Sequence, residues 1–374
     1  MRTLSQACSL VCPHCGYEAK EGQLVCPRCG SFLAYRCQGL RWSVRRGTPS
    51  MWRYMDMMAF RPPRIVTAGE GYTPLVRVGD AQVKLETRNP TGSYADRASS
   101  AIVSALPLGS YRVGYAVDFA ASIAFYGRLA DASVTVVSSP DSLDPFDLIS
   151  IAKAGAQVEF AGSPELRYEN QYTVEGLKTI SYEVVEQARV PDRVFVPAST
   201  GLLAFSMWKG FREAAEARGA SEPDLVAVSV RGSAEPSTIR LARGVRVVKV
   251  EADEVVSSTL RLASRGLYVR PLAAAALVAA ESEGGLAVIT GGLRRPELSH
   301  RRPSDLRERV LDALNSMPEG ATAYDVWESL AGYTLRGVYK ALEALVDEGR
   351  VCVGYSLKGR RKVKVYRPCG PGKA

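Results

Sequence analysis

The fold of this 374-residue chain is decided by one stretch, Lys84-Leu85-Glu86-Thr87-Arg88-Asn89-Pro90-Thr91-Gly92-Ser93-Tyr94-Ala95-Asp96-Arg97. Its first residues end a strand-like run, and its middle is rich in residues that favour turns. Ser93 or Asp96 is placed to cap a following helix, because short polar side chains accept hydrogen bonds from the first helical N–H groups. The stretch therefore predicts a strand, a turn and a helix in succession.

The same alternation continues outward from this stretch, from residue 83 to about residue 292. Apolar runs typical of strands alternate with helix-like stretches such as 120–129 and 179–186. The strand-like runs cover residues 111–116, 133–138, 157–160, 193–197, 225–230, 245–250 and 286–290. This rhythm predicts an α/β domain over residues 41–297, with a mostly parallel sheet covered by helices. A short cysteine module over residues 1–40 precedes it, and a third domain over residues 304–368 follows.

The composition excludes disorder as the main state, since 46% of the residues are hydrophobic and 23% are charged. The formal net charge is +9, which favours a polyanionic partner. No run approaches the roughly 18 apolar residues of a membrane span, and cysteines follow the first residues where a signal peptide would need an apolar region. We therefore expect a cytoplasmic protein with no membrane partner.

Six of the eight cysteines lie in the first 37 residues, which favours metal binding over a disulfide framework. Two Cys-x-x-Cys motifs, each followed by a glycine, are separated by ten residues. Four thiolates on two tight turns can bind one structural Zn²⁺ tetrahedrally and leave no open position for catalysis. The predicted ligands are Cys12, Cys15, Cys26 and Cys29. The alternatives are a ribbon that has lost its metal or one that holds disulfides.

Three further residues of the module have no assigned role at this point. Cys8 and Cys37 flank the two motifs, and either is interpreted as a spare thiol. His14 lies between two predicted ligands and is expected to be a solvated residue at the tip of its turn.

Several stretches of the central domain resemble threonine synthase and related fold-type II enzymes that use pyridoxal phosphate. Besides residues 84–97, they are Ser50-Met51-Trp52-Arg53-Tyr54, Gly69-Glu70-Gly71-Tyr72-Thr73-Pro74-Leu75, Glu175-Gly176-Leu177-Lys178-Thr179-Ile180 and Thr290-Gly291-Gly292-Leu293. With the cysteine module, the resemblance covers about residues 10–297. It implies a fold-type II parallel-sheet domain, but a shared fold does not establish a shared function.

The resemblance places Ala95 where the family has the lysine that forms a Schiff base with the cofactor. Alanine has no amine, so this attachment cannot form there. Lys84 and Lys178 match other family positions, and neither is the attachment site. Rescue by one of these lysines is the alternative.

Other parts of the resembling cofactor site are also altered. Ala116-Val117-Asp118 stands where the family has Ser-Gly-Asn, and the phosphate-binding loop keeps one glycine in Pro197-Ala198-Ser199-Thr200-Gly201-Leu202-Leu203. Thr290 matches the family residue that faces the pyridine nitrogen. The segment 231–236 is shorter than the family's substrate-contacting segment. The altered site is therefore expected to bind a small-molecule effector only weakly and without a covalent bond. Its residues are Asp118, Thr200, Gly201 and Thr290.

The third domain resembles a winged helix-turn-helix domain over about 65 residues. Amphipathic patterns predict helices at 305–314, 322–330 and 334–349, and β-rich runs follow at 351–355 and 362–366. Residues 351–374 contain seven Lys or Arg and no acidic residue. The resemblance implies base contacts from Thr334, Arg336 and Lys340, and phosphate contacts from Lys358, Arg360, Arg361, Lys362 and Lys364. The alternative is a domain for protein contact or dimerisation.

Together these features predict a threonine synthase-like protein without catalytic activity that binds double-stranded DNA and regulates transcription. We expect it to act as a homodimer, with the degenerate cleft as a scaffold or as a sensor of a small ligand. Two other functions stay open. One is an active pyridoxal phosphate-dependent lyase with an unusual lysine, and the other is an RNA- or ribosome-associated binding factor.

Overall fold

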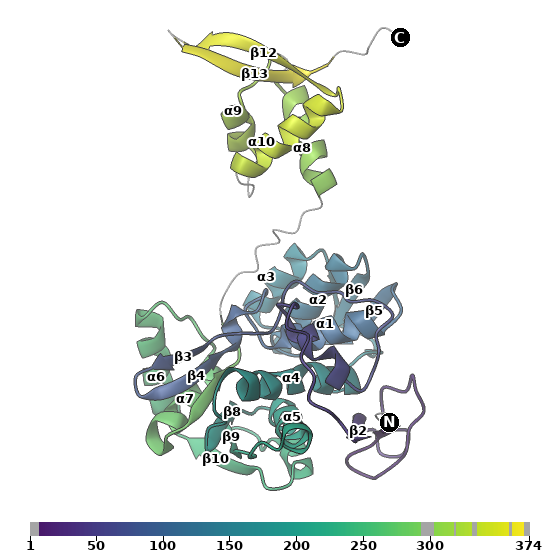
Figure 1. Cartoon of the computed structure of the whole chain (residues 1–374), viewed down its shortest axis with the longest axis vertical. Helices are drawn as coiled ribbons and strands as arrows, with labels where there is room; N and C mark the ends of the chain where they lie inside the picture. The colour runs from purple at the N-terminus through teal and green to yellow at the C-terminus, as the bar shows by residue number, and fades with distance from the viewer. Residues whose placement is uncertain (1–6, 293–302, 318, 331–334, 359–360, 370–374) are drawn as a thin grey trace. The chain divides into compact units, whose positions relative to one another are not determined.

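The structure, a computed structural model, describes residues 7–292, 303–317, 319–330, 335–358 and 361–369 (Figure 1). The chain divides into two compact units, Met1–Pro296 and Glu297–Ala374. The first unit contains the cysteine module and the α/β domain, and the second contains the C-terminal helices and hairpin. Each unit is described by itself below.

The cysteine module is a small antiparallel ribbon that packs on the α/β domain. Strand β1 (Ala7–Val11) pairs with β2 (Ala34–Gln38), and Cys8 lies directly opposite Cys37. The Phe32 ring contacts the Phe205 ring edge-on, with 5.3 Å between centroids. The Nε2 group of Gln171 also donates to the carbonyl oxygen of Gln23 at 2.9 Å. The module is therefore part of the first unit's packed structure.

The mostly parallel α/β fold is confirmed, and its strands fall into two sheets. The larger sheet has the order β10-β9-β8-β11-β4-β3, in which the β3–β4 pair is antiparallel and the others are parallel. Its strands are β3 (Leu75–Val78), β4 (Ala81–Leu85), β8 (Arg193–Pro197), β9 (Asp224–Val230), β10 (Arg246–Val250) and β11 (Leu286–Ile289). The smaller parallel sheet contains β5 (Ser110–Gly114), β6 (Ser133–Val137) and β7 (Gln157–Glu159).

Seven α-helices and four 3₁₀ helices accompany these sheets in the described part of the first unit. The α-helices are α1 (Ala95–Ala105), α2 (Phe119–Leu129), α3 (Pro145–Lys153), α4 (Gln171–Gln187), α5 (Leu202–Arg218), α6 (Ala252–Ser264) and α7 (Pro271–Glu283). The 3₁₀ helices are η1 (Met51–Met57), η2 (Glu86–Arg88), η3 (Pro140–Ser142) and η4 (Ser237–Leu241). Helix α4 begins earlier than the predicted 179–186, because the Asn170 side chain caps it by accepting from the N–H groups of Tyr172 and Thr173.

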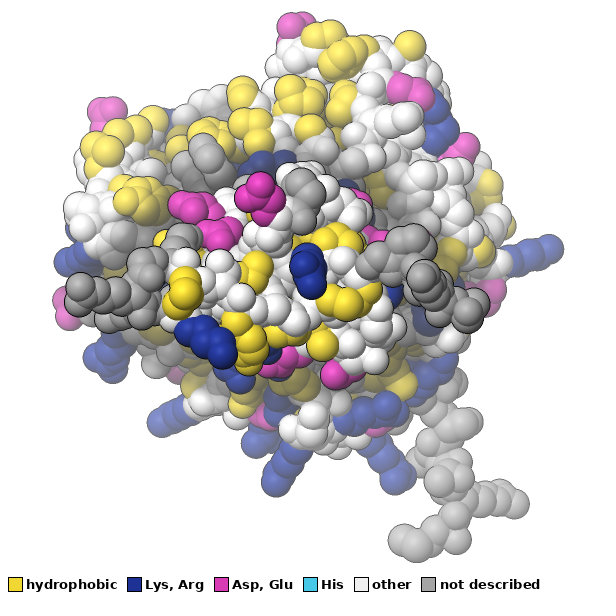
Figure 2. Space-filling view, turned by 90° about the horizontal axis from the view of Figure 1, so that it is seen from above, with side chains coloured by type: hydrophobic (Ala, Val, Ile, Leu, Met, Phe, Trp, Pro, Cys, Tyr) yellow, Lys and Arg dark blue, Asp and Glu magenta, His cyan; other side chains and the backbone are white. Residues whose placement is uncertain are grey.

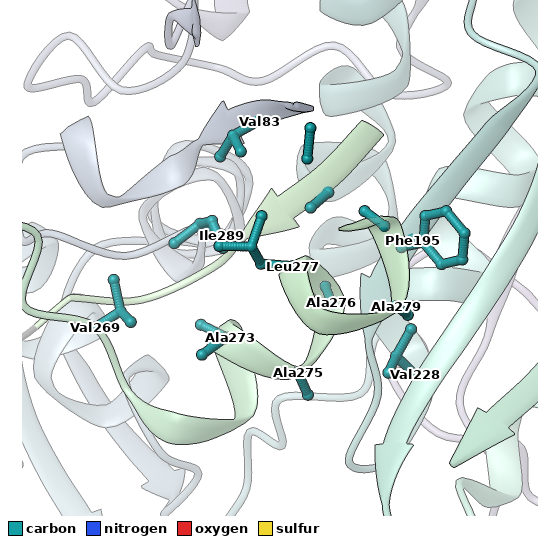
Figure 3. Close-up of a cluster of buried hydrophobic side chains, with 14 of the residues drawn as sticks. Val83, Phe195, Val228, Val269, Ala273, Ala275, Ala276, Leu277, Ala279 and Ile289 are labelled. Carbon is teal, nitrogen blue, oxygen red and sulfur yellow. The ribbon is translucent and has the colours of Figure 1, made fainter. Parts of the chain in front are cut away.

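Helix α7 forms the centre of the larger sheet's hydrophobic core (Figure 3). Its buried face consists mainly of alanines, from Ala273 to Ala276, together with Leu277. Small side chains let the helix approach the sheet closely, and Figure 3 shows it beside Val83, Phe195, Val228 and Ile289.

The second unit contains three helices followed by an antiparallel hairpin. The helices are α8 (Pro303–Asn315), α9 (Ala323–Ser329) and α10 (Leu335–Asp347), and the strands are β12 (Val351–Lys358) and β13 (Arg361–Pro368). Thr322 and Asp325 form a capping box at α9. The core includes Val310, Leu314, Val338, Leu342 and Tyr366.

From the sequence we also expect Tyr324 and Trp327 of α9 to lie in this core rather than to contact bases. Trp327 packs against the core, but Tyr324 is 53% exposed, so the expectation is wrong for Tyr324. Across the described residues of both units, no helix is long and apolar enough to span a bilayer.

Candidate functional site

The four predicted zinc ligands lie together in the cysteine module. Their Sγ atoms are all within 4.8 Å of one another, with Cys12 and Cys29 3.5 Å apart and Cys15 and Cys26 3.6 Å apart. Tetrahedral Zn²⁺ with bonds of about 2.3 Å needs sulfur–sulfur separations of about 3.8 Å. The geometry of this four-cysteine cluster therefore fits zinc.

The turns that carry the cluster also influence its ionisation. Gly16 and Gly30 close the two turns with positive φ values of 72° and 71°, which favour glycine. Burial raises the pKa of the Cys12 thiol to about 12. Burial also opposes ionisation of Cys26, but N–H groups of Cys29 and Arg28 outweigh it and lower the Cys26 pKa to about 7. The N–H groups of the turn thus favour the thiolate form that binds metal.

The other four cysteines form two disulfides. Cys8 bonds to Cys37 across the ribbon, and Cys352 bonds to Cys369 in the second unit. The interpretation of Cys8 or Cys37 as a spare thiol was therefore wrong. It failed because the two cysteines are far apart in sequence, and only the strand register brings them together. His14 is exposed at the tip of its turn, as expected.

Ala95 lies at the start of α1 and is fully buried. Ser93 and Gly291 form a bridge beside it, and the Tyr94 N–H donates to the Thr290 carbonyl at 2.8 Å. The start of α1 is therefore held against Thr290, which directly follows β11. The Ser93 hydroxyl accepts from the Ala95 N–H at 3.2 Å, whereas the Asp96 carboxylate turns back to the Thr91 N–H and hydroxyl.

The two lysines that could replace the missing amine are both buried in ion pairs. The Lys84 Nζ lies 2.7 Å from Glu183 and donates to the Thr73 carbonyl and the Gln187 side chain. The Lys178 Nζ lies 2.7 Å from Glu175 and 2.9 Å from Glu213. Burial lowers the pKa of both lysines, but carboxylates enclose both amines and neither side chain is exposed.

The predicted residue Asp118 is engaged by an arginine that sequence reasoning missed. Asp118 has a φ of +66°, and its carboxylate accepts from the Arg270 Nε at 2.6 Å. The same guanidinium binds Asp144 at 3.0 Å and Asp147 at 2.8 Å. Burial, with Asp147 adding to it, raises the Asp118 pKa to about 6 against the opposing effect of Arg270. No local motif marks Arg270, which precedes α7 more than a hundred residues away in sequence.

The Asp118 carboxylate also lies against Gly291, where a side-chain Cβ would collide with it. Ala95, Asp118 and Thr290 therefore lie around the end of β11, and the Arg270–Asp118 pair joins the residue before α2 to the residue before α7. These residues do not fit pyridoxal phosphate, because the amine is absent and a salt bridge already engages the Asp118 carboxylate.

The remaining phosphate-loop residues lie at the start of α5. Gly201 has a φ of +92°, and Ile239 approaches so closely that a Cβ on Gly201 would lie 2.8 Å from it. The Thr238 N–H donates to the Thr200 carbonyl at 3.0 Å. Helix η4 thus packs against the one glycine that remains in this loop.

The candidate nucleic-acid residues are distributed over α10 and the hairpin. Arg336 and Lys340 are exposed one turn apart on α10, and Lys362 and Lys364 are exposed on one face of β13. The Lys362 Nζ lies 4.6 Å from the Tyr355 ring centroid. Thr334 and Arg360 lie outside the described residues, and Lys358 and Arg361 are described by their backbone alone. Figure 2 shows one face of the molecule, on which Lys and Arg side chains lie among hydrophobic, acidic and uncharged side chains.

The sequence and the fold of this chain are similar to those of enzymes that depend on pyridoxal phosphate. Residues 165–243 match the family described as pyridoxal-phosphate dependent enzyme. The structure of maize serine racemase superposes with a TM-score of 0.51 at 15% identity, covering 60% of this chain and 89% of that one. O-ureido-L-serine synthase gives a TM-score of 0.50 at 17% identity, with 62% and 92% covered. The α/β domain therefore has the fold of fold-type II pyridoxal phosphate enzymes.

Within that class, the chain is related in sequence to threonine synthases. It is 30% identical over 207 residues to the enzyme of Methanocaldococcus jannaschii, covering 46% of this chain and 50% of that one. It is 27% identical over 256 residues to the enzyme of Halalkalibacterium halodurans, covering 60% and 69%. The chain thus spans half the length of the Methanocaldococcus relative.

Proposed function

We propose that this chain is a threonine synthase relative without catalytic activity that binds double-stranded DNA through its C-terminal unit as a homodimer and regulates transcription. The observation that carries the proposal is the basic C-terminal segment of that unit. Residues 351–374 contain seven positive and no negative side chains, and Lys362 and Lys364 are exposed on the hairpin. Such a surface suits the phosphate backbone of a nucleic acid.

The arrangement of the unit supports this proposal. Arg336 and Lys340 share one face of α10 because they are four residues apart. A helix followed by a basic hairpin is the layout of a winged helix, in which the helix enters the major groove and the hairpin contacts the backbone. We assign base contacts to Arg336 and Lys340 and phosphate contacts to Lys362 and Lys364.

The central domain supports the inactive part of the proposal. Ala95 supplies no amine, Lys84 and Lys178 are enclosed by carboxylates, and the Asp118 position is taken by a salt bridge. These changes affect separate requirements of the chemistry, so one substitution does not restore them. The domain then serves as a scaffold or as a sensor for the DNA-binding unit.

Fluorescence anisotropy with labelled genomic DNA fragments and the full-length chain tests the DNA part. Binding should weaken steeply as salt rises, since each phosphate contact contributes a slope of about 0.9 in log K against log salt. Lys362→Ala with Lys364→Ala should weaken binding to all sequences and flatten the slope by about two. Arg336→Ala should cost about 1–3 kcal/mol on a preferred site and reduce sequence preference.

The control removes the same charge elsewhere. Arg243→Gln with Arg265→Gln changes two exposed arginines of the first unit and should leave DNA affinity unchanged. If both double variants lost the same DNA affinity, the loss would reflect net charge alone and not a specific contact surface. No binding at low salt, or much tighter binding to structured RNA, would refute the DNA assignment, and the second result would support the RNA-associated function instead.

A further inference from the structure

The β12–β13 hairpin carries a row of exposed apolar side chains. At the base of the hairpin, Val351 and Tyr366 belong to the core of the second unit. On the same face of β12, Val353, Tyr355 and Leu357 are 38%, 65% and 74% exposed. Exposure rises with distance from the core, and one end of the hairpin extends past α9 (Figure 1). A contiguous row of exposed apolar side chains is typical of an interaction surface.

Two lysines lie on the same face as this apolar row. The strand register places Lys364 opposite Tyr355. It places Lys362 opposite Leu357, and opposite residues of an antiparallel pair share one face. Residues 351–374 contain no acidic residue. We therefore expect the partner of this face to combine negative charge with apolar surface.

The apolar row lies beside the basic face of α10. A hydrogen bond to Tyr366 raises the pKa of Lys364, and the Glu343 carboxylate on α10 adds to this effect, so Glu343 lies near the hairpin lysine. Glu343 also follows Lys340 by three residues and Arg336 by seven, which places the three on one face of the helix. The surface that we assign to DNA thus extends from α10 to the hairpin.

Charge complementarity favours duplex DNA over a second copy of the chain as the partner of this face. Two such faces in contact would bring Lys362 and Lys364 against the lysines of the other copy, and like charges repel. A DNA groove supplies both properties that the face needs. Phosphates line its edges, and apolar side chains such as leucine insert between stacked base pairs from the minor groove.

We propose that the hairpin enters the minor groove of duplex DNA and that Leu357 inserts between two base pairs as a wedge that bends the duplex. Tyr355 contacts the sugars beside the wedge, and Lys362 and Lys364 bind phosphates at the edge of the groove. Pyrimidine–purine steps such as TA unstack most easily, so the wedge prefers them to A-tracts. This inference rests on the proposed DNA binding and adds a preference that phosphate contacts do not provide.

Fluorescence resonance energy transfer between dyes at the two ends of a duplex tests the bend. The full-length chain is added to a duplex with a central TA step and to a duplex of equal length with a central A-tract. Energy transfer should rise more on the TA duplex. Leu357→Ala should abolish this rise and lower the affinity for the TA duplex by about tenfold, because less apolar surface is buried. The salt slope should not change, since no charge is removed.

Leu260→Ala is the matched control, because Leu260 is an exposed leucine of α6 in the first unit. This variant should bend the TA duplex as the unmodified chain does. Leu357→Met keeps a long apolar side chain and should retain the bend. Circular dichroism of each variant checks that it is folded.

The outcomes distinguish this inference from the proposed function. DNA binding without a bend, or an unchanged bend in the folded Leu357→Ala variant, would overturn the wedge and leave the DNA-binding proposal standing. Absence of binding to either duplex would refute both. If Leu357→Ala weakened binding to vesicles of phosphatidylserine and phosphatidylcholine and left DNA binding unchanged, the face would contact membranes and the wedge would be wrong.

Discussion

At the residue scale, the proposed lack of activity rests first on Ala95, which supplies no amine, and then on the changes around it. Restoring the amine with Ala95→Lys should therefore not produce threonine from phosphohomoserine. The Arg270–Asp118 salt bridge would still fill the adjacent space, and η4 would still pack against Gly201. Turnover assays with added pyridoxal phosphate, and mass spectrometry after borohydride reduction, measure this outcome.

The unmodified chain is the control for Ala95→Lys. It should give neither threonine nor a borohydride-stable adduct at Lys84 or Lys178, because both amines are buried within carboxylate pairs. Threonine formation by either protein would contradict the inactive assignment. An adduct without turnover in Ala95→Lys would show that the cofactor can enter and that other residues stop the reaction.

Some residues of the candidate site could be predicted from the sequence, and others could not. Ala95, Asp118 and Thr290 could be predicted because each matches a position in a stretch with a recognisable order of residues. Arg270 could not be predicted, since its three carboxylate partners come from other elements and no spacing connects them. The Cys8–Cys37 bond was missed because no characteristic spacing connects the two cysteines. The four metal-ligand candidates were found because they lie in two Cys-x-x-Cys motifs.

Buried charges join α1, α4 and β4 at the element scale. Arg97 on α1 lies 2.7 Å from Glu86 and 2.6 Å from Glu183 on α4, and all three side chains are fully buried. Glu183→Gln would leave Lys84 and Arg97 short of negative charge. It should lower the free energy of unfolding by about 3–5 kcal/mol, because removing one partner leaves uncompensated buried charge. Urea unfolding at neutral pH measures this loss.

The same glutamate gives the fold a predictable acid sensitivity. Burial alone would raise its pKa, but Arg97 and Lys84 outweigh burial and lower it to about 2. A carboxylate whose pKa is lowered by folding stabilises the fold above its unfolded pKa, and this stability is lost as pH falls towards about 2. The unmodified chain should therefore lose more stability below pH 4.5 than Glu183→Gln does. If the free energy of unfolding depended on pH equally in the two proteins, Glu183 would not be the source of the acid sensitivity.

Close packing of α1 on α4 requires a glycine at position 176. A Cβ there would collide with the backbone carbonyl of Arg97. Gly176→Ala should therefore destabilise the first unit by about 1–3 kcal/mol through overpacking. Gly47→Ala is the matched control, because a Cβ at Gly47 meets no atom within 4 Å and its φ is not positive. Thermal unfolding compares the two, and equal stability would refute the packing argument.

At the scale of elements, the sequence predicted where strands and helices lie better than it predicted which strands pair with one another. Apolar runs located strands β5 to β11 of the α/β domain, but they did not mark β3 and did not show that β5, β6 and β7 form a sheet of their own. Pairing depends on which helices cross between strands, and periodicity carries no such information. The start of α4 was missed because its first turns bury polar residues such as Gln171 and Thr173, which break the apolar pattern.

For the whole molecule, the cysteines divide into two disulfides and one four-cysteine cluster whose geometry fits zinc. We expect one zinc per chain, bound by Cys12, Cys15, Cys26 and Cys29, and four thiols that react after denaturation with chelator and no reductant. Elemental analysis and thiol titration measure both numbers. Cys26→Ser should lose the metal, and Cys352→Ser should retain it. Well-folded protein with little zinc would contradict the assignment.

The Cys8–Cys37 bond closes the cysteine module into a covalent ring that contains both metal-binding turns. When a metal ion leaves, the ring limits how far the two turns can separate, so each remains at high effective concentration for the other. A module with the Cys8–Cys37 bond intact should therefore bind a metal ion again faster than a module in which this bond is reduced, because reduction lets the two strands separate. We therefore expect the redox state of Cys8 and Cys37 to influence how readily the emptied module binds a metal ion again.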